Sequence, residues 1–319
     1  MIKYLGSKRV LVPLITETVQ GLQPSGSVID LFSGTSRVGH GLKAAGYQVL
    51  SNDLNAYATT IATCYIEADS DTHGLKQRAQ EAIDQLNGLS GTPGYFTRTF
   101  CEDSLFFQPR NGARVDAIRD WIANRELDRE LEAVLLTSLM EAADRVDSTC
   151  GVQMAFLKKW APRAHNDLHL RLPDILPKAT SGKGRAHNLD AKDAARQLSG
   201  DIAYLDPPYN QHKYLGNYHI WETLVRWDKP DTYGIACKRV DVRQRKSDFN
   251  AKRRILAAMR DVVEHLDVRH LVVSFSNEGH ISRDEMVDLL SHRGDVLVIE
   301  RDFKRYVGAQ IGIYNPDGR

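Results

Sequence analysis

Cysteine is scarce in this sequence of 319 residues, and its spacing argues against two kinds of cysteine-based site. The four cysteines, Cys64, Cys101, Cys150 and Cys237, are far apart and form no CxxC pair. Neither a zinc knuckle nor a dense disulfide framework is expected, and no metal is implied. Reduced thiols in a cytoplasm are the simplest interpretation.

Long apolar runs and an excess of one charge are also missing. The apolar stretch from Val10 to Ile15 is too short for a signal-peptide core, and Pro13 interrupts it. Nothing approaches the roughly 18 consecutive apolar residues of a membrane-spanning helix, so we expect a soluble cytoplasmic protein with no membrane partner. The formal net charge is only +1, and the total therefore gives no sign of a nucleic-acid partner.

The patterns that are present alternate between helix and strand, as in an α/β sheet. Strands are expected at residues 28–32, 48–51, 201–205, 271–275 and 296–299, and helices at 38–45, 251–266 and 284–290. A helical insertion is expected at residues 65–185, where an apolar stripe includes Leu131, Val134 and Leu135 and a loop occupies residues 162–187. The α/β domain would then consist of residues 1–64 and 186–319.

The most specific feature is the tetrapeptide Asp206-Pro207-Pro208-Tyr209, which follows the apolar residues 202–205. Two prolines fix a rigid loop at the carboxyl edge of the strand, where open α/β sheets bind ligands. The Asp206 carboxylate and the Pro207 carbonyl can accept the two N–H bonds of an exocyclic amine, while the Tyr209 ring stacks on a flat heterocycle. The alternative is a proline turn that only caps the strand.

A second segment, residues 30–36, is a small-residue turn between a strand and a helix, which lets the backbone approach a cofactor closely. It lacks the features of a Walker loop, and Ser36 stands where the GxGxxG fingerprint has its second glycine, so a nicotinamide dehydrogenase is remote. Asp53 follows the next strand, where a carboxylate can accept both hydroxyls of a ribose. Asp53 alone would be interpreted as a helix N-cap, but together with the turn it favours a nucleoside site.

A third segment is Lys3-Tyr4-Leu5-Gly6-Ser7-Lys8, which alone would be only a basic, exposed N-terminus. The three segments in this order resemble the D12 class of adenine-specific DNA methyltransferases, the Dam-related group. In that family a Lys-aromatic-x-Gly-x-Lys segment, a DxFxGxG turn, an acidic residue after the second strand, a helical target-recognition insertion and a late DPPY follow one another. The resemblance implies a Rossmann-like S-adenosylmethionine-dependent methyltransferase sheet, with residues 65–185 as the target-recognition domain.

The resemblance also implies roles for individual residues. The residues that would bind S-adenosylmethionine are Tyr4, Gly6, Lys8, Asp30, Phe32, Gly34, Asp53, Asp190 and Asp206. Asp53 would hold the ribose and Asp190 the adenine of the cofactor, with Asp193 as a competitor for the latter role. Tyr4 replaces the commoner tryptophan of the family.

The activity implied is site-specific methylation of adenine N6 in duplex DNA. The enzyme would either belong to a restriction-modification system with a cognate endonuclease or act alone, and the first is expected. The target base would leave the duplex, Asp206 and Pro207 would accept its amino hydrogens, and Tyr209 would stack on it. Alignment and electrostatics would carry the catalysis, without a metal. The alternatives are methylation of cytosine N4 or of an RNA amine, and a non-catalytic nucleic-acid-binding protein.

Two further segments bear on DNA binding. Residues 237–254 carry eight cations against two aspartates, a local net charge of +6, which leaves −5 for the rest of the chain. The predicted phosphate contacts are Lys238, Arg239, Arg243, Arg245, Lys246, Lys252, Arg253 and Arg254. The aromatic and basic residues from His212 to Trp221 either line the site or pack in the core.

Overall fold

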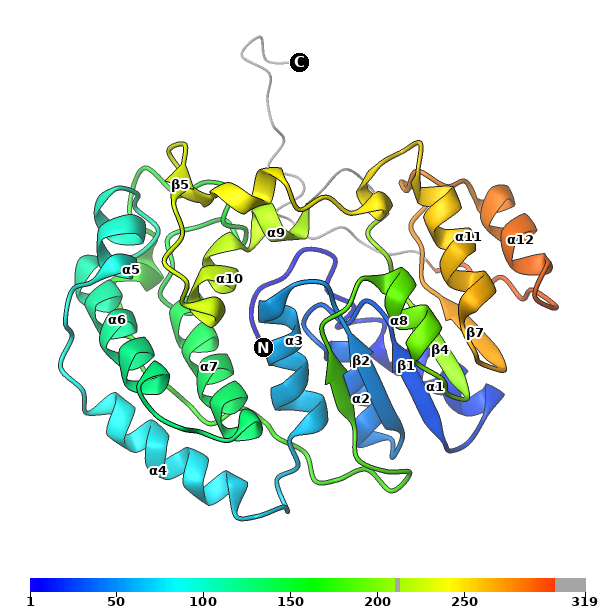
Figure 1. Ribbon diagram of the computed structural model, residues 1–319, viewed down its shortest axis with the longest axis horizontal. Coiled ribbons are helices and arrows are strands. Elements are labelled where there is room, and N and C mark those ends of the chain that lie inside the picture. The colour runs from blue at the N-terminus through cyan, green and yellow to red at the C-terminus, as the bar shows by residue number, and fades with distance from the viewer. Residues whose placement is uncertain (210–212, 302–319) are drawn as a thin grey trace, which may run out of the picture.

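Five parallel strands form the central sheet, in the order β3-β2-β1-β4-β7 (Figure 1). The computed structural model describes residues 1–209 and 213–301. The strands are β1 (Ser27–Asp30), β2 (Gln48–Asn52), β3 (Arg185–His187), β4 (Ile202–Leu205) and β7 (His270–Val273). From the central pair β1 and β4 the chain continues outward in opposite directions, and this places a crevice at the carboxyl ends of that pair. The predicted α/β fold is confirmed.

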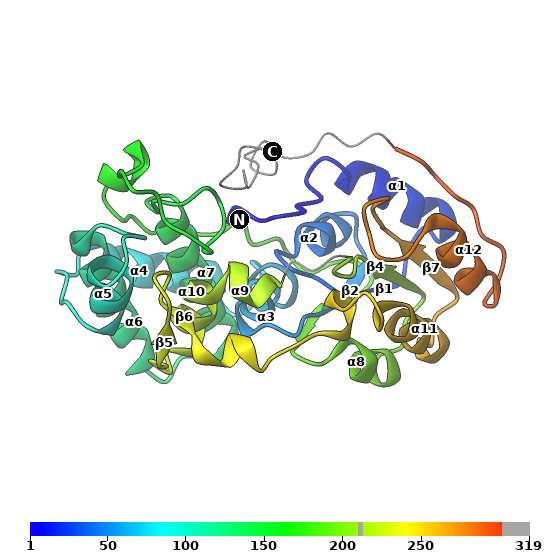
Figure 2. The same ribbon diagram turned by 90° about the horizontal axis from the view of Figure 1, so that it is seen from above.

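Alternating side chains attach two helical layers to the sheet. Val28 packs with the helices α1 (Val12–Leu22) and α2 (Arg37–Ala44), whereas its neighbour Ile29 packs with α8 (Ala191–Gln197) and α11 (Ile255–His265) on the opposite face. Strand β4 repeats the pattern, because Ile202 faces the first layer and Ala203 the second. This period of two is the side-chain period of a strand, so each strand contributes to two apolar cores. Figure 2 shows the two layers above and below the sheet.

The helices of these layers alternate with the strands of the sheet along the chain. They are α1 (Val12–Leu22), α2 (Arg37–Ala44), α3 (Ala56–Ala62) with the turn η1 (Thr63–Glu67), α8 (Ala191–Gln197), α11 (Ile255–His265) and α12 (Arg283–Ser291). Helix α12 begins with a capping box, in which Ser282 and Glu285 exchange hydrogen bonds with each other's backbone amides.

A helical region lies beside the sheet on the left of Figure 1. From the insertion it contains α4 (Leu75–Asn87), α5 (Tyr95–Thr97), η2 (Arg98–Glu102), α6 (Pro109–Ala123), α7 (Arg129–Asp144) and η3 (Pro162–His165). The apolar stripe predicted for α7 is confirmed, because Leu131, Val134 and Leu135 are buried. Part of the chain beyond the insertion joins the same region: α9 (Tyr214–Asn217), α10 (His219–Arg226), β5 (Thr232–Tyr233) and β6 (Lys238–Arg239).

Hydrogen bonds join the two parts of the helical region. The Arg119 guanidinium of α6 donates to the carbonyls of Leu224 and Val225 at the end of α10. These bonds satisfy carbonyls that a helix terminus leaves without partners. The helical region is therefore larger than the predicted insertion of residues 65–185.

Two predictions about strands were wrong. Residues 296–299 form no strand, and Leu297 is 85% exposed. Strand propensity is not sufficient without a pairing strand, and within residues 1–209 and 213–301 no strand pairs with this segment. Conversely, the predicted loop 162–187 ends in β3, whose Ala186 pairs with Ser51 of β2. None of the helices within 1–209 and 213–301 has the length and apolar character needed to cross a membrane.

Candidate active site

A cavity opens at the carboxyl ends of β1, β2 and β4, with an empty volume of about 1130 Å³ that is continuous with solvent. All nine residues predicted to bind the cofactor line this one cavity. They are Tyr4, Gly6, Lys8, Asp30, Phe32, Gly34, Asp53, Asp190 and Asp206. Segments that are up to two hundred residues apart in the chain therefore meet at one edge of the sheet.

The turn after β1 brings backbone close to an aromatic ring. Gly34 has φ +50°, and a Cβ there would lie only 3.1 Å from Cε1 of Tyr4. Ser36 also has a left-handed φ of 57°, so the position where the fingerprint has its second glycine keeps a glycine-like backbone. A side chain in this conformation costs roughly 1 kcal/mol. The sequence thus preserves the turn geometry without the second glycine.

Asp53 connects this turn to the loop after β2. Its Oδ2 accepts the Gly34 N–H at 3.0 Å, and its Oδ1 accepts the Asn55 N–H at 2.9 Å. Asn55 is itself the N-cap position of α3, so Asp53 is not the cap considered from the sequence. Burial raises the pKa of Asp53, although the bonds from Asn55 and Gly34 oppose the rise.

Asp30, at the end of β1, is buried, and its Oδ2 has no hydrogen-bond partner among the described residues. Burial raises the pKa of Asp30 to about 8, and the carboxylates of Asp206 and Asp53 contribute to the rise. A buried, unpaired carboxylate oxygen is costly unless a cation or a donor reaches it. The cavity therefore has the electrostatic character of a site for a positively charged ligand.

Asp206 lies at the end of β4 and pairs with the N-terminal segment. The Lys8 Nζ lies 2.9 Å from the Asp206 Oδ1, and both side chains are less than one-fifth exposed. Burial raises the pKa of Asp206, and the Lys8 ammonium opposes the rise. Lys8 thus favours the ionised, accepting form of the carboxylate.

Pro207 and Tyr209, which were predicted to act with Asp206 on the target base, do not line the cavity, whereas Pro208 does. The Tyr209 ring packs edge-on against Phe275, with the ring centroids 5.9 Å apart. The Tyr209 carbonyl also accepts the His280 N–H at 2.8 Å.

The pair of acidic residues near α8 is distinguished by geometry. Asp190 lines the cavity and caps α8 by accepting the Lys192 N–H, whereas Asp193 is exposed and lies outside the cavity lining. The structure therefore favours Asp190 over its competitor as a cavity contact.

The predicted phosphate contacts divide into buried and exposed residues. Arg239 is only 2% exposed, and it forms ion pairs with Asp228 at 2.7 Å and Asp241 at 3.0 Å. This placement corrects the interpretation of Arg239, because its guanidinium is used inside the protein. Arg245 pairs with buried Glu222, and Lys238 is half-buried. The exposed members of the set are Arg243, Lys246, Lys252, Arg253 and Arg254.

An aromatic stack completes one wall of the cavity. The Tyr4 ring stacks on those of Tyr214 and Tyr218, with centroid distances of 5.2 and 4.6 Å, and the centroids of the latter two rings are 6.5 Å apart. Tyr218 and Trp221 are buried, so core packing is confirmed for these two, whereas Tyr214 lines the cavity. His212 lies outside the described residues.

The sequence interpretation missed the opposite wall. Ser247, Phe249 and Asn250 line the cavity, and Phe249 packs edge-on against Phe32 with centroids 5.0 Å apart. These residues lie within the cationic segment 237–254, which was interpreted only by its charge. The apolar Phe249 inside that run was the available signal.

Comparisons of the sequence with known proteins identify its family. The family model of the D12 class N6 adenine-specific DNA methyltransferases matches residues 4–289. Modification methylase StsI of Streptococcus sanguinis is 33% identical over 303 residues, which are 90% of this chain and 46% of that protein. Type II methyltransferase M.FokI of Planomicrobium okeanokoites is 33% identical over 92% of this chain and 47% of its own length.

The chain therefore spans about half the length of these two relatives. Type II methyltransferase M.NlaIII of Neisseria lactamica is 29% identical over 95% of the chain and 92% of its own length. No solved structure matches the chain. Since the family model covers most of the sequence, the chain belongs to the D12 class of N6 adenine-specific DNA methyltransferases.

Proposed function

We propose that the protein transfers a methyl group from S-adenosylmethionine to the N6 amino group of adenine at a specific site in duplex DNA. The observation that carries this proposal is that Asp206 and the turn from Asp30 to Gly34 line one cavity. An acceptor for an amine thereby lies next to a turn suited to a nucleoside cofactor. Membership of the D12 class supports adenine N6 as the target.

The residues present fit a cationic cofactor. Asp30 offers a buried carboxylate oxygen without a partner, and Gly34 lets the Tyr4 ring lie directly against the turn that lines the cavity. S-adenosylmethionine supplies a methyl group on a positively charged sulfur, and the transfer forms a C–N bond, breaks a C–S bond and releases one proton from N6. Asp30, Phe32 and Gly34 would form the methionine-side pocket, Asp53 would hold the ribose and Asp190 the adenine. Tyr4 would contact the cofactor from the N-terminal segment.

The amine would be held by the end of β4. The Asp206 carboxylate would accept one N6 hydrogen and the Pro207 carbonyl the other, and both bonds increase the electron density on the nitrogen. Lys8 would keep Asp206 ionised while leaving its second oxygen available. Because N6 is paired inside the duplex, the base would leave the stack, and Tyr209 would pack on its face.

The names of the relatives suggest the biological setting. Proteins called modification methylase or Type II methyltransferase are similar over nearly all of this chain. We therefore propose a restriction-modification system with a cognate endonuclease, residues 65–185 as the target-recognition part, and a cytoplasmic location.

The deciding experiment is expression in a methylation-free host, followed by methylation-sensitive sequencing and nucleoside mass spectrometry of its DNA. We expect N6-methyladenine at one sequence. The Asp206→Ala variant should give none, because the acceptor for the amine is lost. Calorimetry should still show binding of S-adenosylmethionine, with lower affinity, because the other eight predicted cofactor residues remain. N4-methylcytosine would instead identify cytosine as the target. Wild-type activity of Asp206→Ala would refute the proposed site.

A further inference from the structure

Some residues of the basic segment 237–254 face the cavity, whereas others are exposed to solvent. Residues 240–250, which we call the strap, follow β6 on the way to α11 and contain the turns η4 (Val240–Arg243) and η5 (Asp248–Asn250). Figure 2 shows this part of the chain crossing from the helical region to the sheet, past α3. Four strap residues, Arg245, Ser247, Phe249 and Asn250, line the cavity. The strap therefore does more than present cations to solvent.

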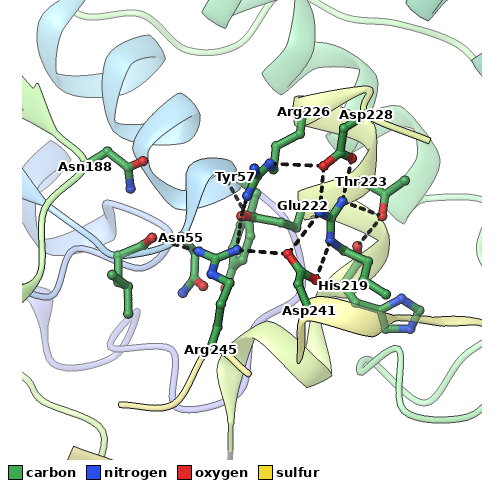
Figure 3. Close-up of polar contacts among 12 residues, drawn as sticks. Asn55, Tyr57, Asn188, His219, Glu222, Thr223, Arg226, Asp228, Asp241 and Arg245 are labelled. Carbon is green, nitrogen blue, oxygen red and sulfur yellow. Dashed lines mark hydrogen bonds and ion pairs between the residues drawn. The ribbon is translucent and has the colours of Figure 1, made fainter. Parts of the chain in front are cut away.

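Arg245 points inward, toward the loop that follows β2 (Figure 3). Its Nη1 lies 2.7 Å from the Glu222 Oε1, and its Nη2 donates to the Leu54 carbonyl at 3.2 Å. Leu54 stands between Asp53 and Asn55, the residues that shape the predicted ribose contact. One guanidinium therefore holds both a carboxylate of α10 and the backbone of that loop.

Glu222 contacts both Arg245 and the start of α3. Its side chain is fully buried, and its Oε2 accepts the Tyr57 N–H at 3.1 Å near the start of α3. A carboxylate at a helix N-terminus stabilises otherwise unpartnered amides. A buried carboxylate is nevertheless costly without a cation, and Arg245 provides the closest one, since the Arg226 Nη1 is 3.7 Å away. Arg245 and Glu222 together fix both ends of the loop from Leu54 to Tyr57.

We propose that Arg245 is a positioning residue for the methyl donor: held by Glu222, it fixes the loop that carries Asp53 in the orientation needed to accept the ribose hydroxyls. The inference rests on the proposed function, because it assumes that the cavity holds S-adenosylmethionine. It replaces the role of Arg245 as a phosphate contact. Loss of Arg245 should therefore weaken cofactor binding and leave DNA binding unchanged.

The test compares two binding measurements on the full chain. Calorimetry without DNA gives the Kd for S-adenosylmethionine, and titration of duplex DNA at several salt concentrations gives the salt slope. We expect Arg245→Ala to weaken cofactor binding about tenfold, as loss of a charge-assisted hydrogen bond predicts, with an unchanged slope. Arg245→Lys should recover part of the affinity, because an ammonium can still pair with Glu222.

Controls separate positioning from general damage. Arg260→Ala removes an exposed arginine of α11 outside the cavity lining and should bind the cofactor as the wild type does. Glu222→Gln should weaken cofactor binding, and the double variant Glu222→Gln/Arg245→Ala should be no weaker than Arg245→Ala, because the two residues act as one unit.

Two outcomes would overturn the inference. One is wild-type cofactor affinity in both Arg245→Ala and Arg245→Lys. The other is a reduced salt slope of DNA binding in Arg245→Ala, which would indicate that Arg245 contacts a phosphate. The proposed function fails separately, if the wild type binds S-adenosylmethionine but methylates no DNA.

Discussion

At the scale of single residues, the structure gives Lys8 a role that the sequence did not predict, an ion pair with Asp206. The resemblance implied a cofactor contact, and Lys8 does line the cavity, yet its ammonium pairs with Asp206. Burial raises the pKa of that carboxyl, and Lys8 offsets part of the rise. The pair therefore links the N-terminal segment to the residue that would accept the amine.

A pH profile tests this link. The variant Lys8→Met removes the charge but retains most of the side-chain volume, so the pKa of Asp206 should rise further. Methyl transfer needs the ionised carboxylate and is lost as the pH falls through that pKa. The acidic limb of kcat/KM against pH should therefore move to higher pH, while Lys8→Arg should resemble the wild type. An unmoved limb in Lys8→Met would contradict this role.

At the scale of elements, the sheet was predictable because its signal is local. Val28 and Ile29 alternate between two cores, and prolines end β4 abruptly after Leu205. β3 escaped prediction because three residues with one buried side chain give no periodicity. Its formation depends on pairing with β2, a contact that lies more than a hundred residues away in the sequence.

In the candidate site, too, features with a local sequence signal were predictable, and contacts between distant residues were not. Asp30 is the last residue of β1, and Asp53 and Asp206 directly follow β2 and β4, so their common position at the sheet edge follows from topology alone. The contact of Glu222 with Tyr57 joins residues 165 positions apart and depends on how α10 packs on α3. No local pattern encodes that packing, and the strap was consequently predicted by its charge alone.

The cluster around Arg239 gives a prediction for the β6 element. Arg239 satisfies Asp228 and Asp241 while almost fully buried, so Arg239→Ala leaves both carboxylates without their main cation. We expect a loss of about 2 kcal/mol in the free energy of unfolding, below the cost for fully buried pairs because both aspartates are partly exposed. The DNA salt slope should not change.

Denaturant unfolding measures this loss. Arg253→Ala is the matched control, since its side chain is exposed, and it should change the free energy by less than about 0.5 kcal/mol. If Arg239→Ala were as stable as the wild type and its DNA binding had a smaller salt slope, Arg239 would be a phosphate contact after all.

At the scale of the whole molecule, the near-zero net charge conceals a cationic segment on an acidic body. The structure refines that separation, because Arg239 and Arg245 are engaged by acidic residues while Arg243, Lys246, Lys252 and Arg253 are exposed. Arg243 and Lys246 lie on the strap, and Lys252 and Arg253 lie between the strap and α11, next to the cavity that the strap lines. A duplex lying over this rim would bring a flipped base to the same opening.

The salt dependence of DNA binding tests this arrangement. Replacing Arg243, Lys246, Lys252 and Arg253 by alanine should reduce the slope of log K against log salt by about 0.9 for each phosphate that the protein no longer neutralises. Affinity for S-adenosylmethionine should be retained, because none of the four lines the cavity. The control is Lys76→Ala/Arg78→Ala on α4, at the bottom of Figure 1 and opposite the strap. If that control reduced the slope as much as the fourfold variant, the duplex would lie on a different face of the protein.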